Sequence, residues 1–148
     1  RSSYYKKAIQ SKKKNTIIFQ QECPEFVSEI EKEKLNFVRL NYLSDLYLRP
    51  LIDKNIEELI LGCSHYPLIY DFLRKKLDLN IRIVDPSVAL VKKFNESFVI
   101  PETVCYEGIS YENVDFFVTS AKDEFFKKVK FWFEINKEIR LVNLRSNV

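Results

Sequence analysis

A short apolar run that stops at a glycine, and continues directly into reactive and polar residues, most constrains how this chain can fold. Residues 59–61 are apolar, the run ends at Gly62, and a cysteine, a serine, a histidine and a tyrosine follow. Pro67 then opens a segment whose apolar residues recur at helical spacing as far as Leu77. The pattern predicts a strand, a tight turn and a helix. In α/β folds, reactive groups lie at this carboxyl end of a strand, beside the free N–H donors of the next helix.

The side chains of this turn predict a site built around a thiol. Cys63 is a candidate acid, base or nucleophile, because a helix N-terminus and a nearby imidazole both favour a thiolate. Ser64 offers a hydroxyl and a backbone N–H to a substrate carboxylate, and Gly62 lets a ligand approach the backbone closely. His65 is the only histidine of the chain and the natural proton partner, since imidazole exchanges protons near neutral pH. The alternative is a buried cysteine followed by a helix-capping serine and a surface histidine.

The rest of the chain alternates between helical and strand patterns, without the turn signals of β-hairpins, which predicts an α/β fold with largely parallel sheets flanked by helices. Helices are expected over residues 2–13, 23–35, 38–52, 67–77, 87–98 and 121–133, and strands over 16–20, 59–61, 81–84, 113–119 and 139–144, with a loop over 99–110. Two helices have apolar residues that we expect to face inward, namely Val38, Tyr42, Leu43, Leu46, Tyr47 and Leu51 in one and Val88, Ala89, Val91 and Phe94 in the other.

Composition excludes several classes of protein. The 148 residues, 46% hydrophobic and 30% charged, are enough for one globular domain with a core. The net charge of +3 is mild and lysines are interspersed with glutamates, so neither nucleic acid nor a membrane is an expected partner. The three cysteines have no metal-type spacing, and their odd number fits free thiols in a reducing cytoplasm. Because methionine is absent and only two glycines are present, we expect a piece of a longer protein.

Residues 61–68, LGCSHYPL, closely resemble the second cysteine motif of glutamate racemases, LGCTHYPL, and differ only in Ser64, which keeps the hydroxyl. Further segments resemble the same family in the same order, from about residue 3 to residue 133. They are Cys23-Pro24 with Phe26, Val27 and Glu31 (family CPLFVPLVE), residues 47–51 (YLxPL), residues 83–85 and residues 116–120 (FYVTGD). His65 favours the glutamate branch, because aspartate racemases of the superfamily usually have glutamate at that position.

The resemblance implies a function and a set of site residues. Glutamate racemases use no cofactor and interconvert L- and D-glutamate with two cysteines on opposite faces of the α-carbon. The D-glutamate product serves peptidoglycan synthesis. Cys63 would be the cysteine that acts on the L-enantiomer, with His65 assisting proton transfer and Gly62, Ser64 and His65 binding substrate. Glu31 aligns with a glutamate that assists the histidine, although a solvated carboxylate is an equally good interpretation in a run rich in glutamates.

The resemblance also implies an incomplete two-lobed fold. Residues 1–80 would belong to an inserted lobe that carries Cys63, and residues 81–148 to the returning part of the first lobe. The first cysteine motif has no counterpart here and is expected upstream of Arg1, and a homodimer is one assembly that the complete enzyme would allow. Two alternatives stay open. In the first alternative, the chain is an inactive fragment or half of a split enzyme. In the second, it is a related racemase that acts on another amino acid.

Overall fold

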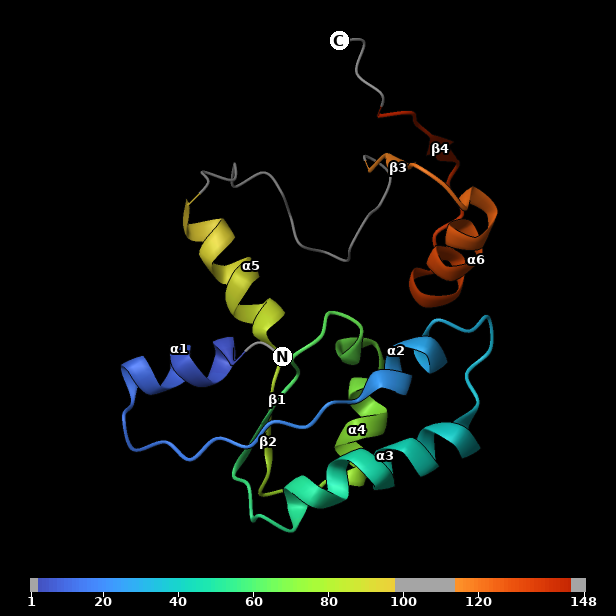
Figure 1. Cartoon of the computed structure of the whole chain (residues 1–148). Helices are drawn as coiled ribbons and strands as arrows, with labels where there is room; N and C mark the ends of the chain where they lie inside the picture. Colours follow the sequence, from blue (N-terminus) through green and yellow to red (C-terminus); the bar gives the residue numbers. More distant parts are fainter. Residues whose placement is uncertain (1–2, 98–113, 145–148) are drawn as a thin grey trace.

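A computed structural model describes residues 3–97 and 114–144, and Figure 1 shows their arrangement. The elements in chain order are α1 (Tyr4–Lys12), α2 (Pro24–Ile30), α3 (Phe37–Ile52), β1 (Glu58–Ile60), the 3-10 helix η1 (Tyr66–Ile69), α4 (Tyr70–Lys76), β2 (Arg82–Val84), α5 (Pro86–Ser97), β3 (Phe116–Val118), α6 (Lys122–Phe133) and β4 (Ile139–Leu141). The predicted α/β class is therefore confirmed.

The strands form two parallel pairs, as the sequence pattern predicted. In the first pair Leu59 of β1 lies opposite Ile83 of β2, and in the second Phe117 of β3 lies opposite Arg140 of β4. Within the described residues these are separate two-stranded sheets. Because strands of a parallel pair end at the same edge, the turn after β1 lies beside the end of β2. The first pair also joins residues on both sides of position 80, where the family resemblance implies a lobe boundary.

The main hydrophobic core lies between the first sheet and helices α2, α3 and α4, which Figure 1 shows on one side of β1 and β2. Leu40 and Leu43 of α3 are completely buried in it. The Phe26 ring meets the Tyr47 and Tyr66 rings edge to face, with centroids 5.2 and 5.7 Å apart, a geometry that favours aromatic pairs. These three rings tie α2, α3 and η1 together, and they fix the end of α2 close to the turn after β1.

Helix α3 has the expected length but not the expected buried face. Asn36 caps it, because its side-chain oxygen accepts a hydrogen bond from the Arg39 backbone N–H at 3.0 Å. Of the residues expected to face inward, Leu43 and Tyr47 are buried and Leu51 is partly buried. The expectation was wrong for three others on the solvent side, Val38, Tyr42 and Leu46. Apolar residues occur on both sides of this helix, so periodicity alone could not say which side packs.

Three expected elements differ from the structure, and one of them, the helix expected over 67–77, is divided into the 3-10 helix η1 and the α-helix α4. Residues 16–20 do not form a strand, and Ile17 is 80% exposed, because no described strand lies beside them to complete a hydrogen-bonded ladder. The helix expected over 23–35 ends at Ile30. Since Asn36 already caps α3, the chain uses residues 31–35 to turn between the two helices. Glu31 therefore lies at the end of α2 instead of inside a helix.

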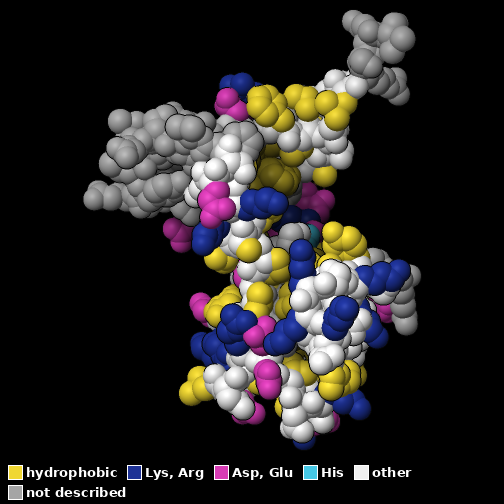
Figure 2. All heavy atoms as spheres, turned by 90° about the vertical axis from the view of Figure 1, so that its left-hand side faces the viewer, with side chains coloured by type: hydrophobic (Ala, Val, Ile, Leu, Met, Phe, Trp, Pro, Cys, Tyr) yellow, Lys and Arg dark blue, Asp and Glu magenta, His cyan; other side chains and the backbone are white. Residues whose placement is uncertain are grey.

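Much apolar surface stays exposed outside this core. Helix α5 has no buried residue, and the expectation that Val88, Val91 and Phe94 face inward was wrong, since each is more than half exposed. Figure 2 views the molecule from the side on which α1 and α5 lie in Figure 1, and it shows hydrophobic side chains at several places on that face. No described helix is long and apolar enough to cross a membrane. The loop expected over 99–110, with Cys105, lies outside the described residues.

Candidate active site

The turn after β1 presents Cys63, as the sequence predicted. Leu61 is buried and its backbone N–H donates to the Val84 carbonyl at 2.9 Å, which extends the parallel pairing one residue past β1. The chain then turns, and the Cys63 carbonyl accepts from the Tyr66 N–H at 3.2 Å where η1 begins. Cys63 is partly buried, and its thiol is free. The buried residue before it and the short helix after it thus hold this cysteine at the strand end.

Three of the predicted site residues form a continuous polar chain. The Cys63 Sγ atom lies 3.8 Å from His65 Nδ1, within hydrogen-bonding reach for sulfur. His65 Nε2 lies 2.9 Å from Glu31 Oε1. An ionised carboxylate only accepts hydrogen bonds, so the proton of the neutral imidazole belongs on Nε2, and Nδ1 is left as an acceptor facing the thiol. This arrangement can take a proton from Cys63 and return it.

Glu31 is held ionised by its surroundings. Its second oxygen lies 3.3 Å from the Lys128 ammonium of α6. Hydrogen bonds from Lys128 first, and from His65 second, lower the pKa of the Glu31 carboxyl below its ordinary value. The family resemblance indicated Glu31, whereas no motif indicated Lys128, which lies 97 positions further along the chain in a helix with lysine at several positions. Only the packing of α6 brings this lysine to the site.

The second described cysteine has a different environment. Cys23 immediately precedes α2, and burial is the main cause that raises its pKa to about 11, so its thiol stays protonated at neutral pH. The Tyr66 hydroxyl donates to the Cys23 carbonyl at 3.5 Å, and burial also raises the Tyr66 pKa. Cys63 and Cys23 are close enough to influence each other electrostatically. Of these two thiols, Cys63 is the one with an imidazole beside it.

Ser64 and Gly62 flank the thiol on the exposed side of the turn. Both are exposed, so both are accessible to a ligand. A Cβ atom placed on Gly62 would meet the Tyr5 ring of α1 at 4.0 Å, which is ordinary van der Waals contact. The glycine therefore leaves room beside the backbone, while the ring of Tyr5 limits that room on one side.

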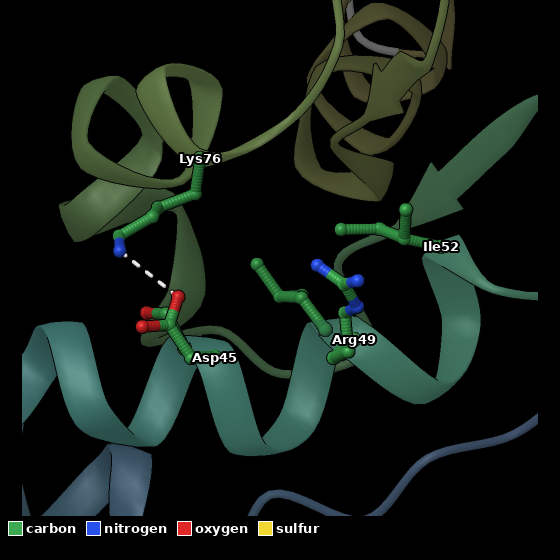
Figure 3. Close-up of a pocket in the computed structure, with 6 residues that line it drawn as sticks. Asp45, Arg49, Ile52 and Lys76 are labelled. Atoms are coloured by element: carbon green, nitrogen blue, oxygen red, sulfur yellow. Dashed lines mark hydrogen bonds and ion pairs between the residues drawn. The ribbon is translucent and has the colours of Figure 1, made fainter.

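A hollow of about 380 Å³ lies elsewhere, between α3 and α4. Figure 3 shows Lys76 of α4 reaching Asp45 of α3 across it, at 3.0 Å. None of its lining residues belongs to the Cys63 cluster. The two charges already neutralise each other, and no thiol or imidazole lines the hollow. We therefore place the candidate active site at Cys63, on the chemistry of its side chains.

The chain is an α/β protein with parallel strands and a candidate thiol-based active site at the end of a strand. Comparison with known proteins shows which family it is similar to. No protein-family model matches the sequence. The chain is 37% identical to the glutamate racemase of Prochlorococcus marinus (strain NATL1A) over 147 residues, which are 99% of this chain and 55% of the relative. It is 33% identical to that of Thermoanaerobacter sp. (strain X514) over 126 residues, or 85% of this chain and 47% of the relative.

Solved structures with a similar fold are also glutamate racemases. A glutamate racemase isoform from Bacillus anthracis superimposes with a TM-score of 0.72 at 21% identity, over 95% of this chain and 52% of that one. The glutamate racemase of Francisella tularensis subsp. tularensis SCHU S4, solved in complex with D-glutamate, gives 0.68 at 26% identity, over 95% and 53%. The chain is therefore a homologue of glutamate racemases, and it spans about half the length of the relatives that it matches.

Proposed function

We propose that this chain contributes one of the two proton-transferring thiols of a glutamate racemase, which interconverts L- and D-glutamate without a cofactor. The observation that carries the proposal is the chain of contacts from Cys63 through His65 to Glu31, in a homologue of glutamate racemases. That the Francisella tularensis relative was solved with D-glutamate supports glutamate as the substrate. A related racemase for another amino acid is the enzymatic alternative, and D-glutamate for peptidoglycan is the proposed use of the product.

In this proposal Cys63 acts on the α-carbon of L-glutamate. The Cys63 thiol passes its proton to His65 Nδ1, and the resulting imidazolium is stabilised by the Glu31 carboxylate on the other ring nitrogen. The thiolate then removes the α-proton, while a second thiol on the opposite face delivers a proton and inverts the stereocentre. Ser64 and the backbone at Gly62 bind the substrate carboxylate, which places fixed donors where negative charge develops.

The second thiol is the part that this chain does not supply in our proposal. Protonated Cys23 lacks a neighbouring histidine and serine of the kind that accompany Cys63. The exposed apolar faces of α5 and β3 would be covered in a complete enzyme, with residues 1–80 in one lobe and residues 81–148 in the other, and with a homodimer as one assembly. The competing interpretation, an inactive fragment or half of a split enzyme, rests on the same exposed faces and on the half-length match.

The test compares the chain alone with a joined enzyme. The joined enzyme fuses this chain to the part of the Prochlorococcus marinus racemase that it does not match, and circular dichroism follows the conversion of L-glutamate. We expect no turnover by the 148 residues alone, turnover by the joined enzyme, and at least a hundred-fold loss with Cys63→Ser, since a proton carrier of this kind contributes roughly 10²–10⁴-fold. Supplying the missing part as a separate polypeptide tests the split-enzyme alternative.

Two results would reject the proposal. Turnover by the chain alone would mean that one chain holds both proton carriers. A Cys63→Ser joined enzyme with undiminished turnover would remove Cys63 from the mechanism. The matched control is Cys23→Ser, which we expect to keep most of the activity.

A further inference from the structure

We propose that Lys128 of α6 is a positioning residue for the site. It holds the Glu31 carboxylate so that one oxygen faces Lys128 while the other accepts the proton of His65 Nε2. This inference rests on the proposed function for its catalytic meaning. Its geometry does not, because it concerns only the contacts among Lys128, Glu31 and His65.

Lys128 and His65 divide the two oxygens of Glu31 between them. The Lys128 ammonium lies 3.3 Å from Oε2, and His65 Nε2 lies 2.9 Å from Oε1. A glutamate at the end of a helix, with 43% of its side chain exposed, would otherwise sample several rotamers. The second contact restricts that freedom, so the carboxylate stays within hydrogen-bonding distance of the imidazole.

Helix α6 is itself anchored in a way that aims Lys128 at the site. Trp132 packs against the main core formed by α2, α3 and α4, and residues four apart lie on the same face of a helix. Lys128 is therefore on the core-facing side of α6, where it reaches Glu31 at the end of α2. Glu124, one turn earlier, accepts from the Lys128 ammonium at 2.9 Å and orients its side chain further. With 27% of its side chain exposed, Lys128 is the least exposed member of this ionic group.

The neighbouring residue provides a matched control. Lys127 also pairs with the segment after α2, through Glu33 at 2.7 Å, but that pair does not touch His65. Removing either lysine deletes one ion pair between α6 and the same turn. Only the loss of Lys128 changes the partners of Glu31.

The charged groups around Glu31 set the sign of the expected effect. They are His65 from the turn before η1, Lys128 and Glu124 from α6, the Lys127–Glu33 pair, and Lys32, which pairs with Glu29. Lys128 is the main cause of the lowered Glu31 pKa. Deleting this cation removes the largest stabilisation of the carboxylate, so Glu31 then takes up its proton at higher pH.

The experiment is nuclear magnetic resonance on the 148-residue chain. Because the chain has one histidine, the two ring-nitrogen signals of His65 are unambiguous, and the carboxyl carbon of Glu31 reports its titration. In Lys128→Met we expect the Glu31 midpoint to move up in pH and the His65 Nε2–H signal to move toward that of an imidazole hydrogen-bonded only to water. Lys128→Arg should restore both signals, and Lys127→Met should leave both unchanged. If Lys128→Met does not fold, Lys128→Gln replaces it.

Unchanged Glu31 and His65 signals in Lys128→Met, or equal shifts in Lys127→Met, would overturn the proposal. Either would show that Glu31 keeps its place without Lys128, or that any lysine of α6 has the same effect. Failure of the proposed function is a separate result. In that case Cys63→Ser would leave the turnover of the joined enzyme unchanged, while the nuclear magnetic resonance signals of the chain would still depend on Lys128.

Discussion

Replacing Glu31 by glutamine tests whether the carboxylate orients and stabilises His65 or is only a solvated surface group. Glutamine keeps the length of the side chain but has one accepting oxygen and an NH₂ group. It therefore cannot present one accepting oxygen to His65 Nε2 and another to Lys128, as the carboxylate does at 2.9 and 3.3 Å. It also cannot stabilise an imidazolium by charge.

The two expected magnitudes differ, and the difference is what the experiment uses. With 33% of the His65 side chain and 43% of the Glu31 side chain exposed, the pair resembles a surface ion pair. Such pairs contribute about 0.2–1 kcal/mol to stability. In the joined enzyme the same carboxylate orients the imidazole and stabilises its cation, so we expect kcat/KM to fall by about 10–100-fold, which is roughly 1.4–2.7 kcal/mol. The loss is smaller than that expected for Cys63→Ser, because His65 itself remains.

Circular dichroism follows racemisation and gives kcat/KM, and urea unfolding gives the stability. The matched control is Glu33→Gln, because Glu33 pairs with Lys127 and not with His65. The stability difference should also depend on pH. The pKa of Glu31 is lowered in the folded chain, so its contribution is present above the ordinary value of 4.5 and is lost as the pH falls through the lowered value. Equal rates in the two variants would refute the role of Glu31 in catalysis.

Two further predictions concern the turn at Cys63 and the start of α6. Ser64→Ala should lower kcat/KM of the joined enzyme, by an amount equivalent to about 1.5–3 kcal/mol of activation free energy, if the hydroxyl binds a substrate carboxylate. Ser64→Thr should be nearly neutral. Tolerance of alanine but not of threonine would contradict this role. Ala121 precedes α6 with φ at 50°, in the left-handed region, so Ala121→Gly should raise the free energy of unfolding by about 0.5–1 kcal/mol in urea titrations. Ala8→Gly within α1 should lower it by about 1 kcal/mol, and stabilisation by both would contradict the strain argument.

The parts of the fold that the sequence predicted are those that local patterns determine. Strand β1 and the turn with Cys63 follow from an apolar run, a glycine and a proline within a few residues. Residues 16–20 contain more β-branched residues than β1, yet they are not a strand, because a strand also needs a neighbour that its own sequence does not specify. The exposed side chains of Val38 and Val88 have a similar cause, since the buried side of a helix depends on what packs against it.

The same distinction separates the residues of the candidate site. Cys63 and His65 are two positions apart, and their contact follows from one turn. Glu31 lies 34 positions before His65, and it was recognised only through the family resemblance, with a solvated carboxylate as an equally good alternative. The structure brings it within 2.9 Å of the imidazole, and its role in catalysis stays a proposal.

Three parts of the fold position the site residues, and a substitution in each part should disturb the site differently. The turn places the thiol and the imidazole, the Phe26, Tyr47 and Tyr66 rings bring the end of α2 to that turn, and α6 then adds Lys128. Loss of the Phe26 ring would therefore lower stability and displace Glu31 together, because burial and position are coupled in the core. Loss of Lys128 leaves the core intact and removes its ion pairs with Glu31 and Glu124, which changes how Glu31 contacts the imidazole. A change confined to the site with unaltered stability thus points to α6, and a change in both points to the aromatic cluster.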